Sequence, residues 1–251
     1  MHSCRDPMPR SPLDREADGR QIAERRIKTQ IGYRRLTGKG DVVTHDPRLE
    51  DLIRLSEGIR GWTRSEEARE LARISFLLPA GPNIVEIGCF LGASTILLAG
   101  PRRLRGSGVV HCVDPFDCSG DSFSIPHYRR ILAESGGGPI RCLFERNIRN
   151  AGLDPWVQVH QGRAAEIARN WATPIDLLYL DGDQSRAGAR EAFDAWAQFL
   201  RPGGVIGLHN SRPENRVLDH DGHRCLVEEK IKAPDYDNVR LVRATTFAIK
   251  S

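Results

Sequence analysis

Two acidic residues stand where a nucleoside could be bound. Glu86 lies near the end of a β-branched run and begins a Glu-x-Gly-x-x-x-Gly-x-Ser pattern that also contains Gly88, Gly92 and Ser94. Asp114 ends the next apolar run, where a carboxylate can accept hydrogen bonds from both ribose hydroxyls of an adenosine. Glycines in such a loop permit a tight turn and a close approach of ligand to backbone. The pattern therefore predicts a site for an adenosine-containing ligand.

The same loop differs from the dinucleotide fingerprint Gly-x-Gly-x-x-Gly. In that fingerprint the central glycine lets a pyrophosphate approach the N-terminus of a helix. Here the position holds Cys89 or Phe90, and the carboxylate of Glu86 just ahead of it would repel a pyrophosphate. A carboxylate suits instead a ligand that carries an ammonium or sulfonium group. These observations favour S-adenosylmethionine over a nicotinamide dinucleotide, so a dehydrogenase is disfavoured.

A parallel sheet with flanking helices is needed to position these residues, and the apolar pattern predicts one. Strand and helix patterns alternate along the chain, which indicates an α/β fold. The predicted strands are Asn83–Ile87, Gly108–Val113, Trp156–His160, Ile175–Leu180, Val205–Leu208, Val239–Val242 and Thr246–Ile249. The predicted helices between them are Ser94–Ala99, Pro126–Glu134, Ile140–Ala151, Ala164–Trp171, Ala187–Phe199 and Cys225–Ile231. A Thr-x-x-Glu capping box at Thr63 and Glu66 predicts one more helix before the first strand.

Four motifs, in this order along the chain, resemble those of class I S-adenosylmethionine-dependent methyltransferases. They are Val85–Gly88 with Gly92 and Ser94, Val113–Asp117, Ile175–Asp183, and Leu200–Ile206 followed by His209 and Asn210. More narrowly, the chain is similar to the group of macrocin O-methyltransferase and other antibiotic sugar O-methyltransferases. The resemblance implies a Rossmann-like, seven-stranded, mostly parallel sheet in the order 3-2-1-4-5-7-6. Its last strand is expected to be antiparallel, with helices on both faces.

The resemblance also implies which residues bind S-adenosylmethionine. The glycine loop would surround the methionine moiety, with Ser94 capping the helix that follows. Asp114 would hold the ribose, Phe116 would pack on the adenine, and Arg163 would lie beside it. Thr63 is a candidate for the methionine carboxylate, although helix capping is its favoured role. The expected cofactor-binding residues are Glu86, Gly88, Gly92, Ser94, Asp114, Phe116, Arg163 and Asp181.

Asp181, His209 and Asn210 are the residues expected to act on the acceptor, because the fourth and fifth strands are neighbours in this fold. A hydroxyl attacks a methyl carbon poorly until its proton is removed or its oxygen is bound by a metal. His209 is the predicted base, since an ordinary imidazole has a pKa of about 6.5. Asp181 is the second predicted catalytic residue, and Asp181 with Asn210 are candidate ligands for Mg²⁺, which prefers oxygen ligands.

The implied activity is O-methylation of a hydroxyl on a small molecule, such as a sugar or natural product, by in-line displacement. Relatives commonly carry a histidine where this chain has Gln184, and a glutamine cannot take up a proton. That difference leaves open N- or carboxyl methylation, or an inactive S-adenosylmethionine-binding protein. His220 and His223 are interpreted as part of a solvated or irregular acceptor-binding loop.

The composition and charge of the chain limit the classes of partner that we expect it to bind. The chain of 251 residues is 39% hydrophobic and 28% charged, which is typical of a globular protein. Most of its net charge of +4 lies in residues 1–50, where acidic residues are interspersed, so a nucleic-acid partner is not expected. No apolar run approaches the ~18 residues that cross a membrane, and the N-terminus does not resemble a signal peptide. We expect a cytoplasmic protein without membrane contact, with homo-oligomerisation left open.

The chain is expected to divide near residue 60. Residues 1–60 are expected to form a disordered basic tail and helical cap, and residues 61–251 the methyltransferase domain.

Overall fold

A seven-stranded sheet organises residues 46–251, which are the residues that the computed structural model describes. The order is β3-β2-β1-β4-β5-β7-β6, as predicted, with β1 to β5 parallel and β7 antiparallel to both of its neighbours. The strands are β1 Asn83–Ile87, β2 Val109–Asp114, β3 Val157–Gln161, β4 Ile175–Leu180, β5 Leu200–Leu208, β6 Tyr236–Val242 and β7 Thr245–Lys250.

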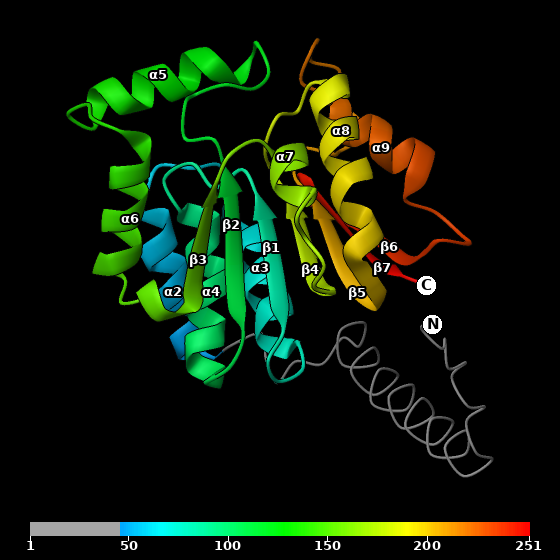
Figure 1. The fold of residues 1–251 in the computed structure, drawn as a ribbon, viewed down its shortest axis with the longest axis horizontal. Coiled ribbons are helices and arrows are strands. Elements are labelled where there is room, and N and C mark those ends of the chain that lie inside the picture. The colour runs from blue at the N-terminus through cyan, green and yellow to red at the C-terminus, as the bar shows by residue number, and fades with distance from the viewer. Residues whose placement is uncertain (1–45) are drawn as a thin grey trace, which may run out of the picture. The chain divides into compact units, whose positions relative to one another are not determined.

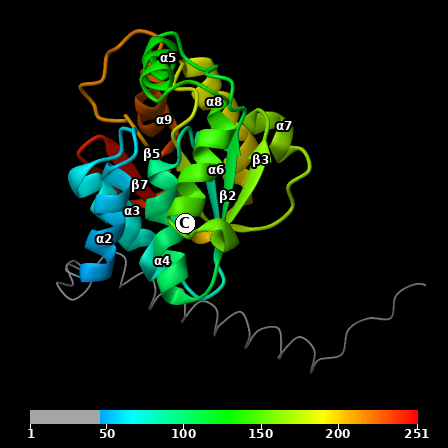
Figure 2. The ribbon, with the colours of Figure 1, turned by 90° about the vertical axis from the view of Figure 1, so that its left-hand side faces the viewer.

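Helices cover both faces of this sheet (Figures 1 and 2), again as predicted. Helices α2, α3 and α4 pack together on one face, while α7, α8 and α9 cover the other. Helix α5 lies beyond the carboxyl ends of the strands, and α6 follows it towards β3 (Figure 1). The helices are α2 Pro47–Glu57, α3 Ser65–Leu77, α4 Ala93–Arg105, α5 Ser124–Glu134, α6 Ile140–Asn150, α7 Ala164–Ala168, α8 Arg186–Trp196 and α9 Gly222–Lys230.

The apolar pattern predicts the central strands well because these strands are buried. β1 and β4 are buried on both faces of the sheet, so their sequences are almost continuous apolar runs. The one charged residue of β4, Asp176, lies near its amino end, where its carboxylate accepts a hydrogen bond from the backbone N–H of Asn83 at 2.8 Å. The same carboxylate pairs with Arg201 at 2.6 Å. These contacts compensate the carboxylate charge of Asp176 at the amino ends of the parallel strands, the end of the sheet away from the predicted site.

Helix α3 begins differently from the prediction. Its N-cap is Arg64, whose backbone N–H donates to the side chain of Glu67 at 3.3 Å. The hydroxyl of Thr63 instead hydrogen-bonds the phenol of Tyr179 on β4 at 3.0 Å. The predicted capping box at Thr63 is therefore wrong by one residue, because Thr63 faces the sheet.

The predicted N-terminal tail lies mostly outside the described residues. Within residues 46–60 the structure forms α2, which Asp46 caps by accepting a hydrogen bond from the N–H of Arg48 at 2.9 Å. Leu52 of α2 packs against Gly100 of α4, where a larger residue would collide with it. Helix α2 is thus attached to the sheet through α4.

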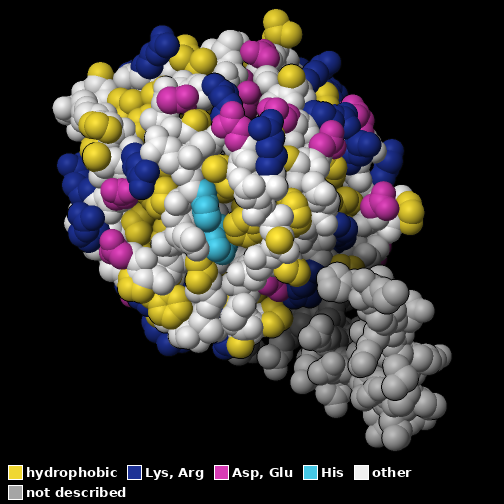
Figure 3. Space-filling view, viewed as in Figure 1, with side chains coloured by type: hydrophobic (Ala, Val, Ile, Leu, Met, Phe, Trp, Pro, Cys, Tyr) yellow, Lys and Arg dark blue, Asp and Glu magenta, His cyan; other side chains and the backbone are white. Residues whose placement is uncertain are grey.

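The surface shows no segregation of charge on the face drawn in Figure 3, where basic and acidic side chains are interspersed. Among the described residues, no helix is both long and apolar enough to cross a membrane.

Candidate active site

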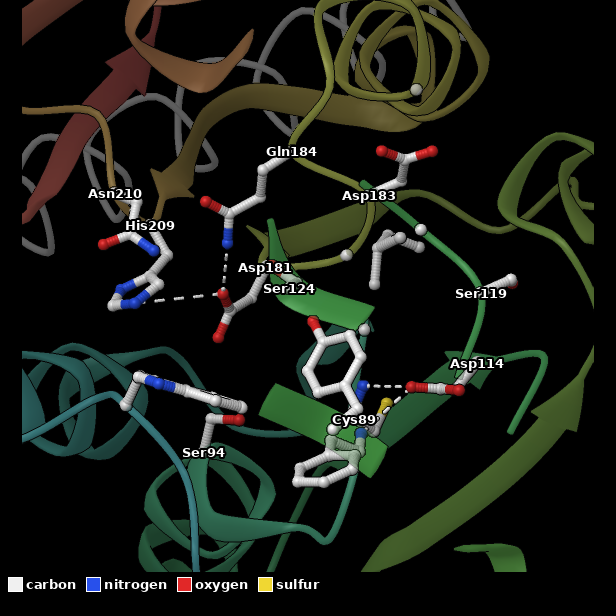
Figure 4. Close-up of a pocket in the computed structure, with 18 of the residues that line it drawn as sticks. Cys89, Ser94, Asp114, Ser119, Ser124, Asp181, Asp183, Gln184, His209 and Asn210 are labelled. Carbon is white, nitrogen blue, oxygen red and sulfur yellow. Dashed lines mark hydrogen bonds and ion pairs between the residues drawn. The ribbon is translucent and has the colours of Figure 1, made fainter. Parts of the chain in front are cut away.

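A cavity of about 400 Å³ opens beyond the carboxyl ends of the parallel strands. Its walls come from the loops after β1, β2, β4 and β5 and from α5, which is where an open parallel sheet binds its ligands (Figure 4). The predicted site residues that line it are Gly88, Ser94, Asp114, Arg163, Asp181, His209 and Asn210. The fold therefore brings most of the predicted site together in one cavity.

The loop after β1 is shaped by two glycines with left-handed backbones. Gly88 has φ of +87° and its N–H donates to the carbonyl of Val113 at 2.9 Å. Gly92 has φ of +91° and is the N-cap of α4, next to the side chains of Phe144 and Ile148. Because non-glycine residues rarely adopt these angles, both glycines are required by the turn itself.

Asp114 fixes this loop from the neighbouring strand. One carboxylate oxygen accepts the backbone N–H groups of Cys89 at 2.7 Å and Phe90 at 3.0 Å, as Figure 4 shows for Cys89. The other oxygen accepts the N–H of Phe116 at 2.6 Å. Burial raises the pKa of Asp114, while these hydrogen bonds act in the opposite direction. The carboxylate is therefore held in one position at the wall of the cavity.

Glu86 lies beneath the loop and not in the cavity wall. Its two carboxylate oxygens accept hydrogen bonds from the hydroxyls of Ser94 and Thr95, and its side chain is fully buried. Burial raises its pKa to about 7. The predicted capping role of Ser94 is wrong, because its hydroxyl is directed at Glu86 and the N-cap is Gly92. Any influence of Glu86 on a bound ammonium group would be exerted through the loop.

Phe116 is also outside the cavity wall. Its side chain is buried, and its ring lies 5.4 Å from that of Phe144 on α6. This placement argues against the expected packing of Phe116 on an adenine, since the positive φ of 56° turns the residue into the core. Arg163 and Ala164, at the start of α7, do line the cavity.

Asp181 and His209 face one another at the ends of β4 and β5 (Figure 4). The Nε2 atom of His209 lies 4.0 Å from Oδ1 of Asp181. Burial raises the pKa of Asp181 well above its ordinary value. Burial, together with nearby His223, lowers the pKa of His209 to about 3. An imidazole with so low a pKa does not hold a proton at neutral pH, so the expectation that His209 is a base with an ordinary pKa is not met.

A chain of two hydrogen bonds, from His209 to Thr245 and from Thr245 to Glu67, sets the tautomer of His209. The hydroxyl of Thr245 donates to the Glu67 carboxylate at 3.1 Å, which leaves its oxygen free to accept a hydrogen bond. That oxygen lies 3.2 Å from Nδ1 of His209. Nδ1 therefore carries the proton, and the lone pair of the neutral ring is on Nε2, the atom that faces Asp181.

The loop after β5 is exposed over most of its length, but two histidines at its end are buried. His220 lies on the cavity wall, and its Nδ1 atom is 3.0 Å from the carboxylate of Asp121. Its Nε2 atom is 3.4 Å from the side-chain nitrogen of Asn210. His223 is also buried and lies 2.7 Å from the carbonyl oxygen of His209. The segment is irregular and mostly exposed, as interpreted, but the side chains of these two histidines are not solvated, and His223 belongs to α9.

Sequence reasoning places Trp62 near the pocket but misses Phe90 and Tyr128 in the wall and Asp121 behind it. Trp62, Phe90 and Tyr128 form an aromatic cluster with ring centroids 4.9 to 5.8 Å apart. Asp121 joins three loops, since it also accepts the backbone N–H groups of Ser124 and Gln184. The sequence signal for Phe90 is an aromatic residue inside the glycine loop, and nothing in the pattern pairs Asp121 with His220.

Comparison with known proteins is consistent with this geometry. The chain is 26% identical over 150 residues to a catechol O-methyltransferase of Niastella koreensis, covering 58% of this chain and 57% of that relative. An O-methyltransferase from Bacillus cereus, solved in complex with SAH, matches with a TM-score of 0.54 at 19% identity, covering 84% of this chain and 94% of that one. The O-methyltransferase TomG from Streptomyces achromogenes, solved with SAM, matches with a TM-score of 0.54 at 21% identity, covering 84% and 92%.

These structural likenesses establish the fold. The family comes from the sequence itself, because the model of the family described as "Methyltransferase domain" matches residues 85–211, half of the chain. The match begins in β1 and ends just after Asn210, so it contains both the glycine loop and the Asp181–His209 pair. The resemblance drawn from the four motifs is thereby confirmed, and the protein belongs to the methyltransferase-domain family.

Proposed function

We propose that this protein transfers the methyl group of S-adenosylmethionine to a hydroxyl of a small molecule. The observation that carries the proposal is that Asp114, the glycine loop and the Asp181–His209 pair all line one cavity. Such a transfer needs a group that binds the nucleoside of the cofactor and groups that contact the acceptor hydroxyl. Asp114 is the first, and the Asp181–His209 pair is the second. The relatives named above, which are O-methyltransferases, support the same assignment.

The residues present fit S-adenosylmethionine. Asp114 offers a fixed carboxylate for the ribose hydroxyls, and the backbone at Gly88 lines the end expected for the methionine moiety. Gly92 lies outside the cavity wall and contributes by shaping the loop. Arg163 and Ala164 lie at the end expected for the adenine. When bound, S-adenosylmethionine supplies a methyl carbon made electrophilic by its sulfonium. The protein's part is to hold this carbon in line with an acceptor oxygen and to exclude competing groups.

Asp181 and His209 are the catalytic residues of this proposal. Both line the cavity, and both direct lone pairs into the space between them. An acceptor hydroxyl placed there would be oriented by these lone pairs, and the Asp181 carboxylate, whose pKa burial raises, would take its proton as the oxygen–methyl bond forms and the sulfur–methyl bond breaks. A hydroxyl needs this help, whereas a neutral amine needs only alignment. The pair therefore favours O-methylation over N-methylation. A sugar or a natural product is the acceptor class that we propose.

Mg²⁺ does not fit the residues that face the acceptor. Asp181 and Asn210 can each offer an oxygen, but the third atom directed at the same space is the imidazole nitrogen of His209. Mg²⁺ prefers an octahedron of oxygen ligands.

The proposal is tested with methyl-labelled S-adenosylmethionine and a panel of acceptors that carry hydroxyl, amine or carboxyl groups. We expect label transfer to at least one hydroxyl acceptor, and micromolar binding of S-adenosylhomocysteine by calorimetry. Transfer confined to amines or carboxylates would overturn the O-specific part. Binding of NAD in place of S-adenosylhomocysteine would overturn the whole proposal. Binding of S-adenosylhomocysteine without any transfer would instead favour an inactive cofactor-binding protein.

A further inference from the structure

Glu67 on α3 is a buried carboxylate behind the candidate active site. Its side chain is 4% exposed and lies outside the cavity wall, with Oε2 3.9 Å from Nδ1 of His209. Acidic side chains are rarely buried so deeply unless they are paired or hydrogen-bonded. Oε2 accepts the backbone N–H of Ala244 at 3.2 Å and the hydroxyl of Thr245 at 3.1 Å. Oε1 accepts the backbone N–H of Arg64 at 3.3 Å, so Glu67 joins the start of α3 to the start of β7.

These contacts fix the direction of the hydrogen bond between Glu67 and Thr245. Both carboxylate oxygens accept backbone N–H groups, which is the arrangement that suits the ionised, acceptor-only form of the side chain. The hydroxyl of Thr245 has a single hydrogen, and this hydrogen is donated to Glu67. None remains for Nδ1 of His209, which lies 3.2 Å from the same hydroxyl oxygen. The ring nitrogen is therefore the donor of that second hydrogen bond.

The fixed proton leaves the lone pair of His209 on the side of Asp181. Nε2 lies 4.0 Å from Oδ1 of Asp181 and is one of three buried side-chain polar atoms without a hydrogen-bond partner within residues 46–251. Oδ1 already accepts a hydrogen bond from the side-chain nitrogen of Gln184 at 3.2 Å (Figure 4). A proton on Nε2 would direct a second N–H at the same oxygen. Because hydrogen bonds to a carboxylate favour its charged form, that donor would make Asp181 a weaker base.

We propose that Glu67 and Thr245 are positioning residues of the methyl transfer, which keep Asp181 free to take the acceptor proton by holding the ring proton of His209 on Nδ1. The inference rests on the proposed function and deepens it by giving a task to side chains outside the cavity wall. Both residues also lie outside residues 85–211, which the family model matches. A carboxylate behind a catalytic histidine selects its tautomer in the same way in serine hydrolases. Here the selection passes through a hydroxyl, and the neighbouring carboxylate benefits.

The alternative is the same chain of hydrogen bonds in the opposite direction. A protonated Glu67 would donate to Thr245, whose hydroxyl would donate to Nδ1 and leave the ring proton of His209 on Nε2. Burial raises the pKa of Glu67, which favours that proton, while the hydrogen bonds to its carboxylate act in the opposite direction. The proton would also make Oε2 a donor and a poorer acceptor for the N–H of Ala244. The contacts therefore favour the ionised form, and the reversed chain becomes one outcome of the experiment.

The experiment locates the ring proton of His209 by long-range ¹H–¹⁵N NMR of the full chain, labelled at histidine, at neutral pH. Protonated and unprotonated imidazole nitrogens resonate far apart, and comparison with His209→Ala identifies the signals of His209. We expect the proton on Nδ1 in the wild type. Thr245→Val removes the hydroxyl, so the proton should move to Nε2, where Asp181 can attract it. Turnover should fall about tenfold or more in this variant, with the affinity for S-adenosylhomocysteine within a few fold.

Thr245→Ser and Thr246→Val are the matched controls. Thr245→Ser keeps the hydroxyl and should restore both the tautomer and most of the turnover. Thr246 is the next residue of β7 and is also buried, and its hydroxyl oxygen accepts a hydrogen bond from Ser211 at 2.7 Å. Thr246→Val therefore removes a buried, hydrogen-bonded hydroxyl from the same strand without altering the contact to His209. It should change neither the tautomer nor turnover.

Glu67→Ala tests the far end of the chain of hydrogen bonds. The variant leaves the hydroxyl of Thr245 without its acceptor and free to donate to Nδ1, so the proton of His209 should again move to Nε2. Glu67→Ala decides the question if Thr245→Val does not fold. A proton on Nε2 in the wild type would overturn the proposal in favour of the reversed chain. An unchanged tautomer in the folded variants would overturn it too, as would a loss of turnover that Thr245→Ser does not restore.

Calorimetry with S-adenosylhomocysteine on the same samples separates this inference from the proposed function. A chain that binds S-adenosylhomocysteine and methylates a hydroxyl, with the proton of His209 on Nε2, defeats only the positioning role of Glu67 and Thr245. A chain that does not bind S-adenosylhomocysteine defeats the proposed function, whatever the tautomer. Retained binding also shows that the variants are folded.

Discussion

Gly88 and Gly182 meet backbone to backbone at the base of the cavity. A Cβ atom built on Gly88 would lie 2.5 Å from both the N and Cα atoms of Gly182, and 2.6 Å from the carbonyl oxygen of Asp181. Gly88→Ala should therefore lower the free energy of unfolding by more than the roughly 1–2 kcal/mol of a left-handed alanine alone. Urea unfolding measures the change.

The control for this substitution is Gly106→Ala. Gly106 has a similar φ of +66° but no heavy atom within 4 Å of a built Cβ, so it isolates the cost of the backbone conformation. Equal losses in the two variants would show that the contact between the two loops is not tight.

Asp114→Asn should weaken the binding of S-adenosylhomocysteine about a hundredfold or more. The variant loses the charge offered to the ribose, and its amide N–H₂ group would face backbone donors in place of an acceptor. Calorimetry measures the affinity, and circular dichroism checks the fold. Unchanged affinity in a folded variant would remove Asp114 from the cofactor site.

His209→Ala should lower turnover about a hundredfold and leave the affinity for S-adenosylhomocysteine within a few fold. The expectation follows because His209 faces Asp181 on the acceptor side and contacts no residue of the glycine loop in the hydrogen bonds described. Turnover is measured with an acceptor identified in the panel. Normal turnover in the variant would exclude His209 from catalysis.

Glu86→Gln should change how stability depends on pH. Burial raises the pKa of Glu86 to about 7 from an ordinary value near 4.5, so the wild-type carboxyl favours the folded state when protonated. Its contribution is fully present below pH 4.5 and is lost as pH rises through 7. Relative to the variant, the wild type should lose stability between pH 4.5 and pH 8 by an amount on the order of 3 kcal/mol.

Urea unfolding at several pH values tests this dependence, with Glu166→Gln as the control because Glu166 is exposed. A difference between wild type and Glu86→Gln that does not vary with pH would mean that Glu86 titrates normally.

The fold was predictable because the residues that define it act locally. Buried strands such as Ile175–Leu180 carry their own apolar signal, and a left-handed turn favours glycine, as at Gly88. Element ends were less predictable. The predicted strand Val205–Leu208 begins earlier in the structure, at Leu200, because pairing with Ile175 extends β5.

The candidate site was predictable where residues follow strands, and not where distant loops meet. Asp114 and Asp181 end strands, so topology alone places them at the cavity. The orientation of Phe116 depends on a positive φ that no pattern signals, and the contact between Asp121 and His220 joins segments 99 residues apart. The pKa of His209 could not be inferred either, because it depends on burial by residues from several elements.

The three backbone hydrogen bonds to Asp114 have a consequence for the kinetics of binding. The carboxylate is immobilised by Cys89, Phe90 and Phe116 before any ligand arrives, so binding need not restrict its rotamers. The conformational entropy of this contact is lost during folding and not during association. The nucleoside end of the cavity is therefore a preorganised receptor, and its association rate should be set by diffusion and access and not by a loop rearrangement.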